Sequence, residues 1–149
     1  MQEYLVFSIG PERFAIALDA VREIRRPPRV TPLPESPVWL RGVTNLRGVI
    51  LAVIDIAVGL GARTEVSEPK GRKCRLVVMR DVDCDAGFCV DAVDGVVTVD
   101  EADLMTPPDT LPELLRRWCE GIAALEAGLV VMLSPEFLSG LQERLGMAK

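Results

Sequence analysis

Four cysteines are the most reactive side chains in this sequence, and no histidine accompanies them. Without histidine the chain lacks the commonest general base and the usual partner of a nucleophilic serine or cysteine. The cysteines are spaced by 10, 5 and 30 positions, at Cys74, Cys84, Cys89 and Cys119. With no C-x-x-C pair, this spacing does not suit zinc and favours reduced, partly buried thiols. Cys74, between Lys73 and Arg75, is the one candidate for a low-pKa nucleophile, although the start of a strand explains it equally well.

Two short motifs resemble cofactor sites but lack the residues that such sites need. Gly59-Leu60-Gly61 is too short for a phosphate loop and has no Lys-Ser/Thr after it. The run 81–87 begins like a calcium loop, but Ala86 occupies the position of the required glycine and Ala92 that of the bidentate glutamate. We therefore expect no catalytic residue, no metal and no cofactor.

Charge is distributed unevenly along the chain. The formal net charge is −5, which disfavours binding to nucleic acid or to an anionic membrane. Arginines cluster between Arg22 and Arg47, whereas residues 81–103 are rich in aspartate. Such an asymmetry is typical of solvated faces, or of two surfaces for two different partners.

Neither a signal peptide nor a membrane-spanning segment is predicted. The chain begins with a strand-like segment, not with a basic region followed by an apolar run, and no window contains 18 uninterrupted apolar residues. We expect a cytoplasmic protein without direct insertion into a membrane.

The apolar residues fall in short, β-branched runs separated by Gly, Pro or Asp, which indicates many short strands. We expect ten, at 4–9, 14–18, 22–25, 30–33, 49–54, 74–79, 87–90, 96–99, 122–125 and 129–133. Ten strands in 149 residues favour small barrels or a sandwich. A polar loop is expected at 64–73.

Signals for helices are few. A turn is expected at 19–21 and a short helix near 37–40. The strongest signal is at the C-terminus, where Ser134 can cap a helix, and Pro135 and Glu136 suit its first turn. Four apolar residues then form one stripe, at Phe137, Leu138, Leu141 and Leu145.

A weak internal repeat suggests two similar halves. Trp39-x-x-Gly42 and Trp118-x-x-Gly121 are each followed by an aliphatic residue, a turn and an aliphatic strand. Chance similarity between two hairpins is the alternative explanation.

The segment 41–50 is the most informative part of the sequence. It predicts a tight connection between two strands, with Asn45 and Gly48 suited to a turn and Leu46 pointing inward. Arg47 is then held out into solvent, or folds back onto a carboxylate or carbonyl groups.

Several segments in order make the whole chain resemble the CheW-like domains of bacterial chemotaxis. They are the initial strand 3–7, the strands 14–18 and 21–25, the turn 31–34, the Gly42-Val43-x-Asn45-Leu46-Arg47-Gly48 motif and the segment 90–96. The resemblance implies a mainly β fold of two five-stranded SH3-like barrels around a shared apolar core, with a few short helices. It also implies one domain over 1–149, with the barrels joined around 56–73.

The resemblance further implies a non-enzymatic adaptor. Its partners would be the regulatory domain of a chemotaxis histidine kinase, contacted barrel to barrel, and the helical cytoplasmic tip of a methyl-accepting chemoreceptor, held in a groove between the barrels. The residues assigned to partner binding on this basis are Val21, Glu23, Gly42, Asn45 and Arg47.

Structural explanations stand beside these assignments. Val21 suits either an apolar contact to a receptor helix or a place in the core. Glu23 suits either an ion pair across the interface or a solvated charge. Gly42 matches a position where small size is required, and Arg47 suits support of the turn and groove wall better than direct contact. The competing functions are a barrel module of another signalling complex, an OB-like nucleic-acid binder, and a cysteine enzyme based on Cys74.

Overall fold

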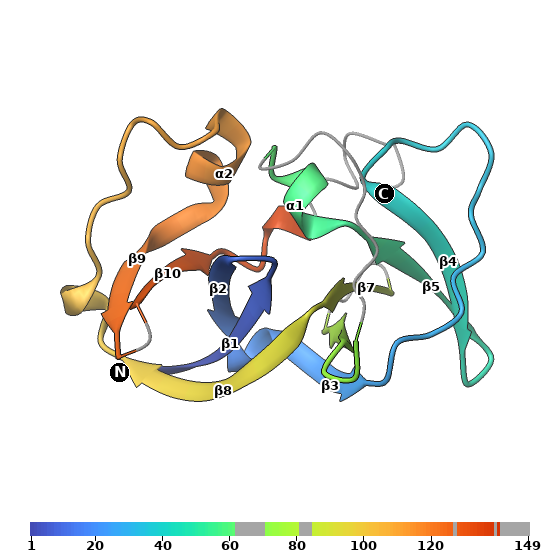
Figure 1. Ribbon diagram of the computed structural model, residues 1–149, viewed down its shortest axis with the longest axis horizontal. Coiled ribbons are helices and arrows are strands. Elements are labelled where there is room, and N and C mark those ends of the chain that lie inside the picture. Colours follow the sequence, from blue (N-terminus) through green and yellow to red (C-terminus); the bar gives the residue numbers. More distant parts are fainter. Residues whose placement is uncertain (62–70, 81–84, 127, 139, 141–149) are drawn as a thin grey trace.

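Two five-stranded sheets make up most of the molecule. The computed structural model describes residues 1–61, 71–80, 85–126, 128–138 and 140. One sheet, here called the terminal barrel, has the strand order β8-β1-β2-β10-β9, and the other, the central barrel, has the order β3-β6-β7-β5-β4. Each sheet coils on itself, and the two lie side by side along the longest axis (Figure 1). The expected mainly β fold with two five-stranded units is confirmed.

The terminal barrel contains β1 (Gln2–Ile9), β2 (Glu12–Ala17), β8 (Ala92–Val99), β9 (Cys119–Leu125) and β10 (Gly128–Leu133). The central barrel contains β3 (Val21–Arg25), β4 (Leu40–Leu46), β5 (Val49–Ile54), β6 (Arg75–Met79) and β7 (Ala86–Val90). The short helices are α1 (Ile56–Gly59) and α2 (Glu113–Trp118), with 3₁₀ turns η1 (Leu18–Ala20) and η2 (Glu101–Asp103).

The chain passes between the barrels at places that differ from the predicted junction. Residues 56–73 connect β5 to β6, and both strands belong to the central barrel. The chain instead enters the central barrel through η1 and leaves it at Asp91, between β7 and β8. The prediction of a junction around 56–73 is therefore wrong. A polar loop between two strands carries no information about whether those strands share a sheet.

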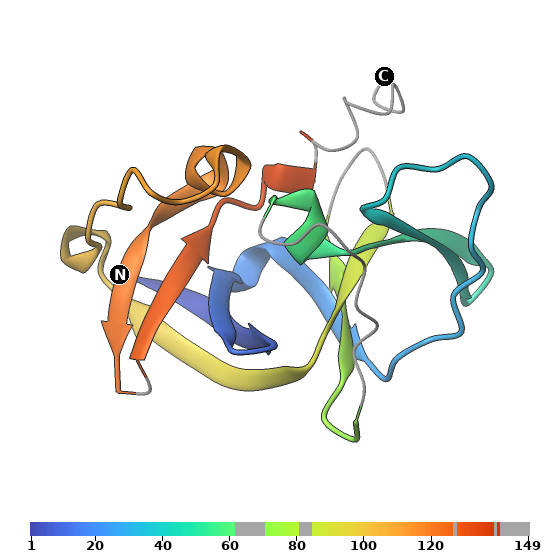
Figure 2. The same cartoon turned by 45° about the horizontal axis from the view of Figure 1, so that its top comes forward.

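The largest core cluster is shared by the two barrels. It joins Phe7 and Phe14 of the terminal barrel to Phe88 of the central barrel, with Phe7 and Phe88 ring centroids 5.2 Å apart. Phe137 packs on Phe88 with a centroid distance of 6.1 Å. Helix α1 lies between the barrels in both views, and its Ile56 is buried in the same cluster (Figures 1 and 2). Smaller clusters fill the interior of each barrel separately.

The two barrels repeat one topology, as the internal sequence repeat predicted. In each, three antiparallel strands are joined to an antiparallel pair by one parallel pairing, β2 with β10 in the terminal barrel and β7 with β5 in the central barrel. The tryptophans of the repeat accept equivalent hydrogen bonds, from Asp55 N to Trp39 O and from Ser134 N to Trp118 O, both at 2.7 Å. Gly42 and Gly121 have φ of +146° and +156°.

Several predicted elements differ from those observed. The expected strand 30–33 is a single bridge between Thr31 and Val43, and the expected helix near 37–40 is a turn. Prolines throughout 27–37 remove the amide donors that a longer strand or helix needs. Helices α1 and α2 were not predicted, because four and six residues are too few to show a helical period.

The predicted C-terminal helix is described only at its start. Residues 137, 138 and 140 are helical, and the Ser134 hydroxyl accepts a hydrogen bond from Glu136 N at 3.3 Å. Leu141 and Leu145 lie outside the described residues. Among the residues that the structure describes, no helix is long and apolar enough to span a lipid bilayer.

Candidate functional site

The turn between β4 and β5 has the tight geometry that its sequence predicts. Leu46 pairs with Val49, which leaves a two-residue loop of Arg47 and Gly48. Both loop residues have positive φ, 52° and 86°, as in the type I′ turn that matches the twist of a hairpin. The Asn45 side chain accepts a hydrogen bond from Gly48 N at 2.8 Å. Asn45 therefore stabilises the turn that places Arg47.

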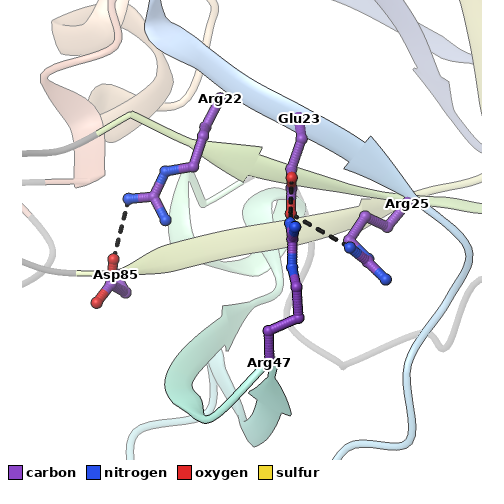
Figure 3. Close-up of polar contacts among 5 residues, drawn as sticks. All are labelled: Arg22, Glu23, Arg25, Arg47 and Asp85. Carbon is purple, nitrogen blue, oxygen red and sulfur yellow. Dashed lines mark hydrogen bonds and ion pairs between the residues drawn. The ribbon is translucent and has the colours of Figure 1, made fainter.

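Arg47 reaches from this turn to Glu23 on β3. Its Nη2 lies 2.6 Å from Oε1 and 2.5 Å from Oε2 of Glu23, and the two side chains point toward one another (Figure 3). Arg25, two residues further along β3, lies 3.6 Å from the same carboxylate. The ion pair ties the tip of the β4–β5 hairpin to β3, at the opposite edge of the same sheet.

The electrostatics of the pair favour its charged form. The hydrogen bond from Arg47 lowers the pKa of the Glu23 carboxyl, and the charges of Arg47 and Arg25 lower it further. The hydrogen bond to Glu23 likewise raises the pKa of the Arg47 guanidinium. Both partners are therefore ionised near neutral pH.

A second ion pair lies nearby on β3. Arg22 Nη2 contacts Asp85 Oδ1 at 3.0 Å, just before β7 begins (Figure 3). Arg22, Glu23 and Arg25 together make β3 a strongly charged edge strand. Charges on an edge strand discourage unwanted pairing with strands of other chains.

Two of the predicted site residues lie in the interior. Val21 is 9% exposed and belongs to the shared core cluster, which is the structural alternative that the sequence left open. Gly42 is buried, and a Cβ at this position would collide with the carbonyl oxygen of Thr31. The requirement for small size at Gly42 therefore has a steric cause inside the barrel. Of the five predicted residues, the turn brings Glu23, Asn45 and Arg47 together.

Exposed apolar residues lie close in sequence to both partners of this ion pair, and the sequence did not predict their exposure. Ile24 on β3 is 41% exposed, and Val49 and Ile50 at the start of β5 are 44% and 62% exposed. The signal was present in β5, whose six residues are all apolar. One buried face of a strand accommodates only alternate residues, so such a run must leave some side chains outside.

The described thiols do not have the properties of a catalytic nucleophile. Cys74 and Cys89 are buried and Cys119 is half-buried, while Cys84 lies outside the described residues. Burial raises the pKa of the Cys74 thiol. The negative charge of Asp91 raises this pKa further, whereas the positive charge of Arg75 lowers it. Burial also raises the pKa of Cys119. Within the described part of the chain, no group of three His, Cys, Asp or Glu residues could hold a metal ion.

Comparison with known proteins agrees with this geometry. The CheW-like domain model matches residues 3–143. The chemotaxis protein CheW of Rhizobium meliloti (strain 1021) is 31% identical over 143 residues, which cover 96% of this chain and 90% of that protein. A probable chemotaxis protein CheW of Rhizobium etli is 34% identical over 139 residues, covering 92% and 86% respectively.

A solved structure also has this fold. The scaffolding protein TtCheW from Thermoanaerobacter tengcongensis matches with a TM-score of 0.76 and 28% sequence identity, over 89% of this chain and 83% of that one. A family model that spans nearly the whole chain and this shared fold both indicate the same family. The chain therefore belongs to the CheW-like family, whose relatives named above are chemotaxis and scaffolding proteins.

Proposed function

We propose that this protein is a non-enzymatic adaptor that couples a chemoreceptor to a chemotaxis histidine kinase in the bacterial cytoplasm. It would bind the helical cytoplasmic tip of a methyl-accepting receptor and the regulatory domain of the kinase. Membership of the CheW-like family supports the adaptor role. The absence of histidine from the sequence and the raised pKa values of Cys74 and Cys119 support a role without catalysis.

The observation that carries the proposal is the ion pair between Glu23 and Arg47. It holds the β4–β5 hairpin against β3, and these strands carry the exposed Ile24, Val49 and Ile50. Exposed apolar side chains on strands that an ion pair holds together suit the apolar stripe of an amphipathic helix. In this proposal the exposed apolar residues contact the receptor, the ion pair positions them, and Val21 supports β3 from within.

The repeated topology of the two barrels supports the kinase as the other partner. A kinase regulatory domain with the same pair of barrels could contact this chain barrel to barrel, because each barrel presents an equivalent set of strand ends. An adaptor with two distinct surfaces needs only modest affinity at each, since linkage within an assembly raises the effective concentration of both partners.

Isothermal titration calorimetry with two exposed-residue variants tests the proposal. Ile50→Asp removes an apolar contact next to the ion pair, and Leu129→Asp is its matched control at the start of β10, because the two side chains are 62% and 63% exposed. A desolvated carboxylate against a helix weakens binding, so we expect Ile50→Asp to lower affinity for a dimeric receptor-tip fragment by at least about tenfold. Leu129→Asp should leave receptor affinity unchanged.

The kinase regulatory domain provides the second arm of this experiment. We expect saturable binding of about micromolar affinity, on the order of −8 kcal/mol. Circular dichroism establishes that each variant is folded. Absence of binding to both partners by the folded wild-type protein would contradict the adaptor function, and equal losses for the two variants would contradict the receptor surface.

A further inference from the structure

Five basic side chains meet where β3 ends and β6 begins. Arg25 pairs with Leu76 at the end of the antiparallel ladder between these strands. Arg26, the next residue along the chain, therefore lies beside Arg75, the residue before Leu76. The turn that leads into β6 adds two more basic residues. We call this set the basic cluster, and its members are Arg25, Arg26, Arg72, Lys73 and Arg75.

Both views of the fold show this juxtaposition, and the side chains are accessible. In Figures 1 and 2 the yellow-green segment that leads into β6 lies beside the end of β3. Four of the five basic residues are exposed, and Arg75 is half-buried. Arg75 Nη1 donates hydrogen bonds to the carbonyl oxygens of Arg72 at 2.9 Å and Cys74 at 2.6 Å. These bonds hold the guanidinium against the turn and leave its positive charge unbalanced, because a carbonyl group carries no net charge.

One carboxylate near the basic cluster is already neutralised. Glu23 pairs with Arg47 at 2.5 Å, and Arg25 lies further from it, at 3.6 Å. Figure 3 shows Arg25 and Arg47 approaching this carboxylate from different sides. One carboxylate shared by two guanidinium groups leaves one positive charge in excess. Glu23 therefore does not cancel the charge that Arg25 brings to the cluster.

The rest of the cluster has little opposing charge. Among the residues that the structure describes, no carboxylate forms an ion pair with Arg26, Arg72 or Lys73. Asp91 is near enough to raise the pKa of the buried Cys74 thiol, and its carboxylate already binds a backbone amide. Counted over these residues, five positive charges against the one negative charge of Asp91 leave an excess of four.

The spacing of these charges indicates which anion suits them. Neighbouring strands lie about 4.8 Å apart and residues along a strand rise about 3.3 Å, so the backbone positions of the cluster are closely spaced. An extended acidic peptide presents a carboxylate to one face only about every 6.6 Å, because alternate side chains point to opposite faces. Linked phosphate groups concentrate more negative charge in the same length, and each offers several acceptor oxygens. The basic cluster therefore suits an oligophosphate better than an acidic peptide.

A long or flat polyanion suits this molecule less well. Residues 21–90, which include the cluster, contain twelve Lys and Arg against eight Asp and Glu, a formal charge of +4. Residues 1–20 and 91–149, which include the terminal barrel, contain five against fourteen, a formal charge of −9. This acidic part would repel a nucleic acid or an anionic membrane that extends beyond the cluster. Because salt screens charges beyond about 8 Å, a short anion interacts mainly with the cluster itself.

We propose that the basic cluster is a binding site for an oligophosphate, a short chain of linked phosphate groups. Arg26 and Arg72 would bind successive phosphates through the paired N–H donors of their guanidinium groups. Lys73 adds a point charge, and Arg75 contributes a cation that its hydrogen bonds already hold in place. The chain can be inorganic or carried by a nucleoside, since all of these contacts go to phosphate oxygens.

Isothermal titration calorimetry with sodium tripolyphosphate, without divalent cations, tests the site. The wild-type protein should bind it saturably in about 50 mM salt, and about 500 mM salt should weaken binding at least roughly tenfold through screening. Inorganic phosphate should bind at least about tenfold more weakly, because one phosphate group reaches fewer of the cations. Uridine triphosphate distinguishes the two sources. An affinity within about threefold of that of tripolyphosphate would show that the phosphates alone are recognised, and tighter binding would identify a nucleotide as the source.

A double variant and a matched control make the test specific. Arg26→Gln with Arg72→Gln removes two exposed cations of the cluster and should weaken tripolyphosphate binding at least about tenfold. The control, Arg116→Gln with Arg117→Gln, removes the same charge from two exposed arginines of α2 and should bind like the wild type. Circular dichroism establishes that both variants are folded.

Absence of saturable tripolyphosphate binding by the folded wild-type protein at low salt would overturn the proposal. Equal losses in the two double variants would show a general charge effect and would also overturn it. Tighter binding of a hexaglutamate peptide than of tripolyphosphate would assign the surface to an acidic protein segment, and the proposed class of ligand would be wrong. Neither the receptor nor the kinase enters these titrations, so the proposed adaptor function is tested separately.

Discussion

The Glu23–Arg47 pair combines close contact with considerable exposure, since the two side chains are 26% and 65% exposed. Solvent-exposed ion pairs contribute little to folding stability, because water and salt screen the attraction. Their hydrogen bonds still restrict the side chains to one geometry. The value of this pair therefore lies in positioning the hairpin tip against β3.

The titration of Glu23 reports directly on the pair. Because Arg47 lowers the pKa of Glu23 below its ordinary value of 4.5, the pair adds stability above that value and loses it as pH falls through the lowered pKa. We expect Arg47→Ala to raise the pKa of Glu23, as measured by NMR of its side-chain carboxyl carbon. Arg22→Ala, which removes the pair with Asp85 instead, is the control and should leave the pKa of Glu23 unchanged. An unaltered pKa in Arg47→Ala would exclude the pair in solution.

At the scale of elements, the β4–β5 hairpin uses two glycines for different reasons. Gly42 sits at the bulge, where the backbone approaches the carbonyl of Thr31 too closely for a side chain. Gly48 completes the turn with φ of 86°, and a Cβ there would meet no atom within 4 Å. The first position excludes side chains by contact and the second only by backbone conformation.

Alanine at these positions should separate the two effects. Gly42→Ala must displace the segment around Thr31 in addition to straining the backbone, so we expect a loss of about 2–4 kcal/mol in the free energy of unfolding. Gly48→Ala, the control, should lose only about 1 kcal/mol from the left-handed conformation. Urea unfolding followed by circular dichroism measures both. Equal losses would show that the contact with Thr31 relaxes without cost.

At the scale of the whole molecule, the shared core makes the barrels interdependent. Phe88 contacts Phe7 of the other barrel and Phe137 beyond β10, and it is fully buried. The chain also crosses between the barrels twice, at η1 and at Asp91. The central barrel is one continuous segment and the terminal barrel is assembled from both ends of the chain, but the largest core cluster needs residues of both.

Truncation of Phe88 should therefore weaken both barrels together. We expect Phe88→Ala to cost about 3–5 kcal/mol through the cavity that it leaves at the junction. Native-state hydrogen exchange should show reduced protection of amides in β1 and β2 as well as in β6 and β7. Phe88→Leu retains most of the volume and should lose much less. Reduced protection confined to the central barrel would mean that the barrels unfold independently.

Short-range signals made much of this architecture predictable. The ten expected strands include nine that overlap observed ones, because turn residues and β-branched runs act locally. Strand β4 was not predicted as a strand, because its residues were assigned to the tight-turn motif and to the internal repeat. The expected strand at 30–33 is wrong because its neighbours are prolines, and a lone bridge at Thr31 is all that remains.

The candidate site was predictable in part. The Gly42–Gly48 motif predicted the turn. Of the two alternatives for Arg47, the structure shows the one in which it folds back onto a carboxylate, that of Glu23. The sequence could not name that carboxylate, because 24 positions separate the partners. Nor could it decide whether Val21 faces a partner or the core, since a valine in a short strand suits both sides equally.

The sequence by itself determined most of the strands, the tight turn at Arg47 and Gly48, the lack of histidine chemistry and the family. These depend on residue types and on contacts between near neighbours along the chain. Only the tertiary structure decided where the chain crosses between barrels and which side chains are buried. Those properties arise from the closure of sheets between distant segments, and local sequence does not encode which of several compatible pairings buries the most apolar surface.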